Sequence, residues 1–451
     1  MNPLVPLAMF GWPVAVLAMF TVLPPRKAVY VAMIGAWLFL PVASYAVPGL
    51  PDITKMSITC FSVFAGTLLF HPTRLGSLRL TPTDAALVAW LLSPFISAMS
   101  AGYGPYEGAS GVLNQAVSWG MPYLIGRVYF SDADGLRALA VAVFIGGLAY
   151  VPFVLFEARM SPVLHSWVYG FHQHQFAQAR RGDGWRPTVF MQHGLAVGLF
   201  MGSAAVSGFW LWLSGEVRTL RQLPTWLLAS GLMAVAAACR SSYALVLMLM
   251  GLGALAACRI LKTKVLIGLL ILVAPLYIAA RTVGGWDAQL LRELAELFGE
   301  DRRESLDVRL VSEDGCWNFM QPNLLFGDCR MDRLMLRTSP TERFIPDALW
   351  LIVLTKNGVF GLVALYCFLL LPVATYLTRF RSSVVLSKQL GGAMIAATVL
   401  VLYVMDSLLN AMVNPIYLLG AGGLAGLATS RASTGPAHVS AHTLTGEARS
   451  A

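Results

Sequence analysis

The chain has 451 residues, of which 57% are hydrophobic and only 12% are charged, and its formal net charge is +9. Soluble domains carry about 25% charged residues, so this composition excludes a soluble protein and indicates a polytopic membrane protein. Most of the excess positive charge lies in short loops, where it sets the orientation of membrane helices, and we therefore discard nucleic acid as a partner.

Apolar runs of roughly 20 residues, the length that crosses a bilayer as a helix, follow one another along most of the chain. The first begins at Met1 without a basic segment ahead of it, so it is interpreted as a span and not as a signal peptide. The predicted fold is an all-α transmembrane bundle of 12–13 spans formed by residues 1–430, with a disordered cytoplasmic tail over 431–451. The spans are placed at about 4–23, 28–48, 54–71, 84–101, 111–129, 136–157, 189–213, 223–239, 241–258, 264–280, 347–378, 391–409 and 411–429.

The lysines and arginines of the short loops predict the orientation. Basic loops, such as the one with Arg26 and Lys27, alternate in constant phase with loops that hold only Lys55 or no basic residue. This pattern puts the N-terminus outside the cytoplasm and the C-terminus inside. It also requires the span at 111–129, which is the most polar of the set.

Three outward-facing segments carry arginine, although positive charge is normally sparse on that side. The first is a loop of about 158–188, in which histidines and aromatic residues are interleaved with arginines, Arg180, Arg181 and Arg186 among them. Its aromatic side chains are interpreted either as an interfacial belt or as platforms for sugar rings. The second segment is the tight turn at Arg240.

The third outward segment is a large loop over 281–346. Its stretch 286–298 has leucines on one face and is predicted to be an amphipathic helix that lies on the membrane or packs on the bundle. Cys316 and Cys329 share this loop, and a disulfide between them is predicted if the compartment is oxidising. The spacing of the cysteines does not suggest a metal site.

Arginines of these segments reach the outer membrane surface at one depth. Arg186 precedes a span, Arg240 lies in a turn with almost no loop, and Arg281 follows a span. A guanidinium group binds phosphate through a rigid pair of donors and keeps its charge. The three arginines therefore predict a site for a lipid-linked phosphate or pyrophosphate. The alternative, that each one reaches the interface for its own solvation, stays open.

Four motifs resemble, in order, those of the O-antigen ligase and polymerase superfamily. They are Arg186-Pro-Thr-Val-Phe-Met-Gln-His193-Gly, then Arg240-Ser-Ser-Tyr, then Asp307-Val-Arg309 with Trp317 and Pro322-Asn-Leu-Leu-Phe-Gly327, and finally Asp347-Ala-Leu-Trp with Lys356-Asn-Gly358-Val-Phe-Gly361. The motifs cover about residues 180–365, and the arrangement of spans extends the resemblance to most of the chain.

The resemblance implies a membrane glycosyltransferase with a helical fold of the C type and a large periplasmic loop. Such enzymes act at the periplasmic face of the bacterial inner membrane. They transfer a glycan from undecaprenyl pyrophosphate to an acceptor hydroxyl, without a metal or other cofactor. The implied partners are the lipid-linked oligosaccharide, membrane lipid, a flippase and a chain-length regulator. The residues expected to bind the pyrophosphate are Arg186, Arg240, Arg309 and Arg281, with Asp406 and Trp317 in support.

The general base that deprotonates the acceptor hydroxyl has two candidates. Asp347 stands near the position at which ligases of this superfamily usually carry a histidine, and this departure favours a polymerase. We expect Asp347 to be buried against Trp350, although it could instead be a helix N-cap. His193 is the second candidate, unless it is a satisfied core histidine. Asp406 is a rare intramembrane acid that is expected to pair with an arginine.

The sequence thus predicts a polymerase of capsule, O-antigen or exopolysaccharide chains. The nearest alternative is the ligase that transfers the finished glycan to the lipid A core. The alternative from another class is a lipid-linked sugar transporter or flippase. Transporters commonly show internal repeats and a site at the midplane, whereas this chain shows no convincing repeat and gathers its charged residues at one face.

Overall fold

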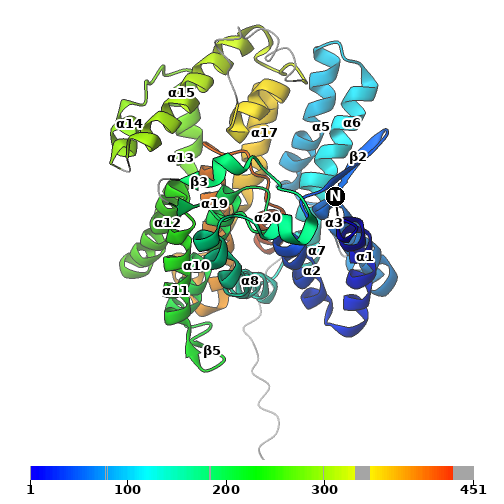
Figure 1. Cartoon of the computed structure of the whole chain (residues 1–451), viewed down its shortest axis with the longest axis vertical. Coiled ribbons are helices and arrows are strands. Elements are labelled where there is room, and N and C mark those ends of the chain that lie inside the picture. The colour runs from blue at the N-terminus through cyan, green and yellow to red at the C-terminus, as the bar shows by residue number, and fades with distance from the viewer. Residues whose placement is uncertain are drawn as a thin grey trace, which may run out of the picture.

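The computed structural model describes residues 2–76, 78, 80–181, 184–297, 299–330 and 346–429. These residues form a helical membrane bundle with short two-stranded hairpins (Figure 1). Within this part of the chain, seven helices are long and apolar enough to cross a bilayer, and four shorter apolar helices accompany them. The predicted all-α membrane protein is therefore confirmed, while the tail 431–451 lies outside the described residues.

Each of the thirteen predicted spans contains a helix. The helices of these predicted spans are α1 (Leu4–Val22), α2 (Pro25–Phe39), α3 (Lys55–Phe70), α5 (Asp84–Ser100), α6 (Pro105–Gln115), α7 (Met121–Tyr129), α8 (Ala133–Met160), α10 (Gly194–Leu213), α11 (Thr225–Ala238), α12 (Ser242–Leu261), α13 (Val265–Thr282), α17 (Leu349–Arg379), α19 (Gly391–Asp406) and α20 (Pro415–Thr429). A π-helical turn, η1 (Ala116–Gly120), joins α6 to α7 within the span predicted at 111–129.

Short elements lie between these helices. They are the hairpins β1 (Ser44–Val47) with β2 (Leu50–Thr54), β3 (Arg180–Arg181) with β4 (Gly184–Trp185) and β5 (Thr219–Leu220) with β6 (Leu223–Pro224), the helices α4 (Pro72–Gly76), α9 (Leu164–Tyr169), α14 (Gln289–Glu296), α15 (Glu300–Met320) and α18 (Ser382–Val385), and the 3-10 turns η2 (Phe176–Ala179), η3 (Gln321–Asn323) and η4 (Lys388–Leu390).

The span predicted at 28–48 is shorter than expected. Helix α2 ends at Phe39, and the chain then forms the antiparallel β1–β2 hairpin. Pro41 explains the end of the helix, because the residue before a proline avoids the helical conformation. Thr54 then starts α3 through reciprocal side chain-to-backbone hydrogen bonds with Ser57, a capping box.

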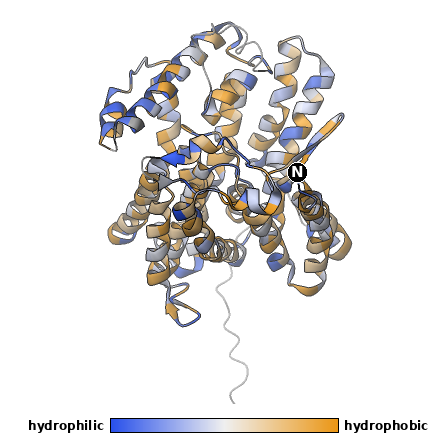
Figure 2. Ribbon diagram, viewed as in Figure 1, coloured by the Kyte–Doolittle hydropathy of each residue, from blue (hydrophilic) through white to orange (hydrophobic). Residues whose placement is uncertain are grey.

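Helices α10, α19 and α20 lie at the centre of the bundle. They are apolar on all sides and most of their residues are buried, as expected for helices that other helices surround. Helix α10 packs against α8, α11, α12 and α19, and α20 packs against α7, α17 and α19. Hydrophilic residues are concentrated in α14 and α15, which lie together at one end of the molecule (Figure 2).

The large loop at 281–346 contains two helices. Helix α14 is the predicted amphipathic helix, but it is shorter than expected, and Leu290 and Leu294 are exposed while Leu291 packs toward α15. The long helix α15 was not predicted, because charged residues dilute its apolar face. Residues 331–345 of the loop lie outside the described part of the chain.

Candidate functional site

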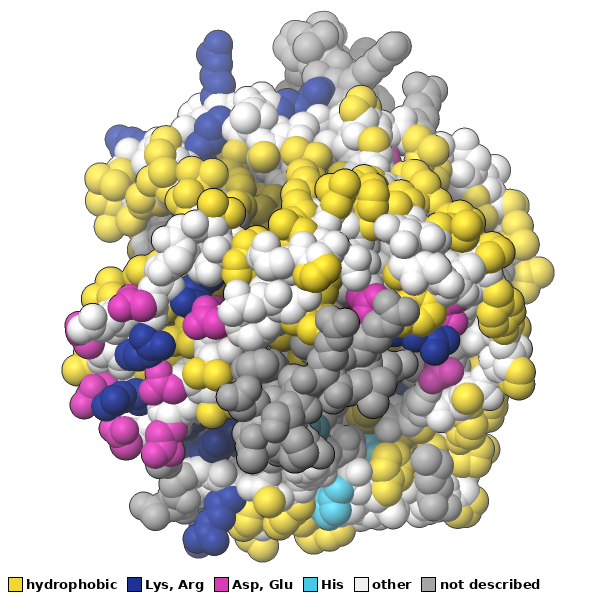
Figure 3. Space-filling model, turned by 90° about the horizontal axis from the view of Figure 1, so that it is seen from above, with side chains coloured by type: hydrophobic (Ala, Val, Ile, Leu, Met, Phe, Trp, Pro, Cys, Tyr) yellow, Lys and Arg dark blue, Asp and Glu magenta, His cyan; other side chains and the backbone are white. Residues whose placement is uncertain are grey.

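The ends of the central helices meet at one end of the bundle, which we call the site end. Helices α10, α12 and α17 begin there, and α11, α13 and α19 end there. The hydroxyl of Tyr243 donates to the carbonyl of Met405 at 2.7 Å, and the indole of Trp350 donates to the carbonyl of Leu408 at 3.2 Å. Seen from this end, positive and negative side chains gather over α14 and α15, and hydrophobic side chains surround much of the rim (Figure 3).

The segment before α10 carries Arg186 and is held in place by a buried carboxylate. Its backbone is buried without being helical, so its polar groups need partners. Glu157 of α8, which is fully buried, accepts the N–H of Thr188 at 2.9 Å, of Val189 at 2.7 Å and of Leu164 at 2.9 Å. Val189 has a φ of 48°, a conformation that a β-branched residue adopts only when its surroundings enforce it.

Other side chains bind the remaining polar groups of this segment. The hydroxyl of Tyr150 accepts the N–H of Phe190 at 3.0 Å, and the ammonium of Lys55 donates to the carbonyl of Phe190 at 2.8 Å. Gln173 donates to the carbonyls of Val189 and Met191, both at 3.1 Å. The segment is therefore a rigid support for the residues at its two ends.

Four arginines lie around this support, and we call Arg181, Arg186, Arg240 and Arg309 the arginine group. Arg240, in the turn between α11 and α12, donates to the carbonyl of Arg181 at 2.9 Å, and Arg186 donates to the carbonyl of Arg240 at 3.3 Å. Gly184 makes this contact possible, since a Cβ there would lie 2.4 Å from the guanidinium of Arg240. The hairpin β3–β4 and the turn thus bring the first two predicted arginines together.

Three members of the arginine group have no carboxylate partner among the described residues. The Nε atoms of Arg181 and Arg186 are buried without a hydrogen-bond partner. Among the described residues, no carboxylate forms an ion pair with Arg181, Arg186 or Arg240. Burial, together with the charges of Arg181, Arg302 and Arg309, lowers the pKa of Arg186. Buried charge without a partner is unfavourable, so this arrangement is suited to an anion.

Arg309 of α15 connects the arginine group to two acids. Burial lowers the pKa of Arg309, whereas the charges of Asp347 and Asp406 raise it. Asp406 is buried at the end of α19, where it accepts a hydrogen bond from the amide of Asn410 at 2.7 Å. Asp347 is exposed just before α17. The third predicted arginine and both predicted acids therefore lie close to one another.

Two expectations about Asp347 are wrong. Its side chain is exposed, whereas Trp350 is fully buried, so the expected burial of the acid against this ring does not occur. The N-cap position of α17 is Ala348, and no side chain caps the helix there. Asp347 is therefore exposed and does not cap α17.

His193 is the N-cap of α10. Its Nδ1 accepts the N–H of Leu195 at 3.1 Å, so in the neutral ring the proton is on Nε2, which is then a donor. Burial lowers the pKa of His193 to about 3, and the charges of His174 and of neighbouring arginines act in the same direction. A neutral ring whose free nitrogen carries the proton is a poor general base, and this geometry favours Asp347 for that role.

Arg281 lies outside the arginine group. Its guanidinium pairs with Glu313 and Asp314 of α15, both at 2.7 Å, and also donates to the carbonyls of Trp286 and Leu310. Arg281 therefore attaches α15 to α13, and its charge is already paired, contrary to the expectation that it binds pyrophosphate. Trp317 of α15 packs against the main hydrophobic core.

The third and fourth motifs pair with each other through their backbones. The N–H of Asp328 donates to the carbonyl of Thr355 at 2.9 Å, and the N–H of Val359 donates to the carbonyl of Leu324 at 2.9 Å. Gly358 has a φ of 65° and interrupts α17 at this crossing. A Cβ at Gly327 would lie 2.6 Å from the backbone of the other segment. These two glycines therefore permit direct backbone contact.

The predicted disulfide is absent. Cys316 and Cys329 are both free thiols. Cys316 faces the core from α15, whereas Cys329 is fixed beside α17, where its N–H donates to the carbonyl of Lys356 at 2.9 Å. The backbone pairing of the two motifs accounts for the position of Cys329.

Arg181 and Glu157 were not predicted as site residues. Arg181 and Arg186 lie on the two sides of the β3–β4 hairpin, and the Gly-Asp-Gly sequence between them could have indicated a turn that brings these arginines near each other. Glu157 is an acid at the end of a long apolar run, a position that by itself suggests a specific partner.

In comparisons with known proteins, no family model and no curated protein matches this chain.

Proposed function

We propose that the protein is a polysaccharide polymerase. It transfers a glycan from an undecaprenyl-pyrophosphate-linked donor to a sugar hydroxyl of the acceptor, at the periplasmic face of the bacterial inner membrane. The arginine group carries this proposal, because buried Arg186, which forms no ion pair with a described carboxylate, lies with three further arginines at the end of a membrane bundle, and such a cluster suits a lipid-linked diphosphate.

In the proposed reaction, the acceptor oxygen forms a bond to the anomeric carbon as the bond from that carbon to the pyrophosphate oxygen breaks. The bonding electrons leave with the pyrophosphate, whose growing charge the arginine group stabilises. The acceptor proton passes to the carboxylate of Asp347, which is exposed beside Arg309. Binding donor and acceptor in one place adds the advantage of proximity.

The test is a transfer assay in lipid nanodiscs with a lipid-linked oligosaccharide as donor. Arg186→Ala and Arg240→Ala are each expected to lower the rate of polymer formation about 10²–10³-fold. Arg159→Ala, which removes an exposed arginine at the end of α8, is the matched control and should keep the wild-type rate. Full-length polymer from both site variants would refute the mechanism.

The products separate the proposal from its alternatives. Longer chains on the carrier lipid are expected. Transfer of the glycan to lipid A core alone would identify a ligase, and movement of the donor across the bilayer without a new glycosidic bond would identify a flippase.

A further inference from the structure

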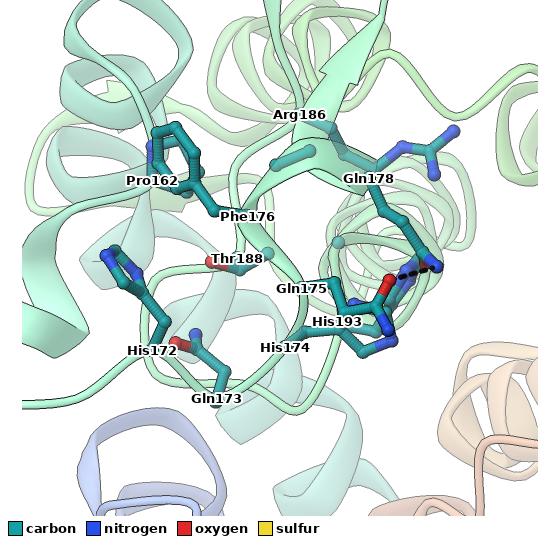
Figure 4. A pocket seen from close by; sticks show the side chains of 12 residues that line it. Pro162, His172, Gln173, His174, Gln175, Phe176, Gln178, Arg186, Thr188 and His193 are labelled. Atoms are coloured by element: carbon teal, nitrogen blue, oxygen red, sulfur yellow. Dashed lines mark hydrogen bonds between the residues drawn. The ribbon is translucent and has the colours of Figure 1, made fainter.

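The hollow beside Arg186 has room for about one water molecule. Figure 4 shows it between the 172–178 loop and His193, and its volume is only about 20 Å³. A second cavity has a volume of about 640 Å³, which falls within the range of about 300–1,000 Å³ for small-molecule sites. It runs between α2 and α8 from the end of the bundle at which α8 begins, opposite the site end, and we call it the α2–α8 groove.

The α2–α8 groove follows one face of α8. Its lining on this helix includes every fourth residue from Arg137 through Val141 and Ile145 to Ala149, the spacing of a single helical face. Ile34 and other residues of α2 form the opposite wall. Arg137 and Ala149 are 12 residues apart, which is about 18 Å along a helix. One leaflet of the hydrocarbon core is about 15 Å deep, so the groove is as long as one layer of lipid chains.

A lipid chain fits this groove better than a polar ligand does. Its lining residues are apolar except for Tyr30, Asp134 and Arg137. Helix α8 is long and apolar enough to cross a bilayer, and Ile145 and Ala149 are exposed on it, so the groove opens toward lipid. An unfilled groove would lose dispersion contacts that a chain restores. Because lipid tails are all apolar, the selection of one lipid over another depends on the headgroup.

Two opposite charges mark the headgroup end of the groove. Asp134 and Arg137 both line it and are exposed, and they are neighbours on the surface of α8 because they are three residues apart. Arg137 nevertheless pairs with Glu216: its Nε lies 3.5 Å from Oε2, and its Nη2 donates to the carbonyl at 3.2 Å. Within the described part of the chain, Asp134 forms no ion pair and Nη1 of Arg137 forms no hydrogen bond. The two charges are thus held apart, and both are available to one ligand.

We propose that the α2–α8 groove binds one molecule of a zwitterionic phospholipid, phosphatidylethanolamine. One acyl chain occupies the groove, the phosphate accepts hydrogen bonds from Arg137, and the primary ammonium donates to Asp134. Phosphatidylglycerol has no ammonium for Asp134, and the trimethylated ammonium of phosphatidylcholine has no N–H to donate. The groove and the arginine group lie toward opposite ends of the bundle, so this inference is independent of the proposed transfer reaction.

The experiment measures lipid binding to the full chain in detergent by native mass spectrometry. The probes are phosphatidylethanolamine, phosphatidylglycerol and phosphatidylcholine with identical acyl chains. The wild type is expected to bind phosphatidylethanolamine about tenfold more tightly than either other lipid, the equivalent of one hydrogen bond between charged groups. Asp134→Asn should remove this preference, and Arg137→Gln should weaken the binding of all three lipids about tenfold. Ala149→Phe fills the far end of the groove and should abolish binding, whereas the matched control Ala234→Phe, at an exposed alanine of α11 outside the groove, should not.

Three results would overturn the proposal. Equal affinities for the three lipids, or a preference that survives in Asp134→Asn, would overturn the assignment of the headgroup. Binding of phosphatidylethanolamine that is unchanged in Ala149→Phe would overturn the groove as the site. Undecaprenyl phosphate serves as a fourth probe, and its displacement of phosphatidylethanolamine at equal concentration would assign the groove to the carrier lipid instead.

Discussion

Replacing Glu157 with glutamine removes the charge that holds the Arg186 segment without changing the size of the side chain. The carboxylate accepts three backbone N–H groups, two of which belong to Thr188 and Val189. A glutamine has one acceptor oxygen, so in either orientation its NH₂ group faces at least one N–H donor. A hydrogen bond to a charged group contributes about 1.5–3 kcal/mol. We therefore expect Glu157→Gln to weaken the segment by about 2–4 kcal/mol, because one bond is lost and a buried donor is left unsatisfied.

Hydrogen exchange reports this change directly. A loss of about 2–4 kcal/mol corresponds to roughly 30- to 1000-fold faster exchange of the amides in 188–193, where opening is local. Transfer activity should fall as well, since Arg186 and His193 lie at the two ends of this segment. Glu216→Gln is the matched control. Glu216 is also a buried acceptor, but it bonds the N–H of Gly392, at the start of α19.

The reasoning would be refuted if Glu157→Gln left the exchange of Thr188 and Val189 unchanged. It would also be refuted if Glu216→Gln accelerated that exchange to the same extent, because the effect would then reflect global stability and not the support of the segment.

Three further predictions concern single side chains. His193→Asn keeps an N-cap and a neutral donor and should retain most of the transfer activity. Asp347→Asn removes the proposed base and should lower the rate about 10²–10⁴-fold. Equal losses of rate in the two variants would reject the assignment of Asp347 as the base. Burial lowers the pKa of His165 from 6.5 to about 4, so only the unfolded state takes up a proton in this window. The contribution of His165 to stability should be constant above pH 6.5 and should fall by about 1.4 kcal/mol per pH unit down to about pH 4, and the lowered pKa of His193 should add a loss of the same sign over this range. Melting curves over this range should show the loss, and His165→Gln should reduce it. Arg281→Met leaves the charge of Glu313 buried without its partner and should lower the free energy of unfolding by about 3–5 kcal/mol, measured by denaturation in detergent.

The sequence was most informative where the bilayer imposes a strong pattern. Runs of apolar residues predicted each of the seven described helices that are long and apolar enough to cross a bilayer. Shorter helices depart further from the prediction, since α2 ends early before Pro41 and α6 begins at Pro105, ahead of the span predicted at 111–129. Helix α15 was missed because its buried face, which includes Leu306, Leu310 and Cys316, is interspersed with charged residues. The apolar residues of α15 do not recur at helical spacing clearly enough to distinguish its sequence from that of a polar loop.

The site was predictable only in part, because a sequence shows charges but not their partners. Arg186 and Arg240 were selected for their position at the ends of spans, and the structure brings them together. Arg281 was selected on the same grounds, but its partners lie in α15, which the sequence did not reveal as a helix. Position at the membrane surface therefore identified arginines without distinguishing a binding residue from a structural one.

The pairing of the other buried arginines is the strongest argument that the arginine group serves a ligand. Arg127 is buried and lies 3.2 Å from the carboxylate of Asp84, and Arg281 lies 2.7 Å from that of Glu313. A fold that only needed to bury an arginine could supply an acid, as this chain does twice. At Arg186 it supplies further arginines, and no described carboxylate forms an ion pair with this guanidinium. Such an arrangement is unfavourable by itself, and the diphosphate of the proposed donor would offset that cost.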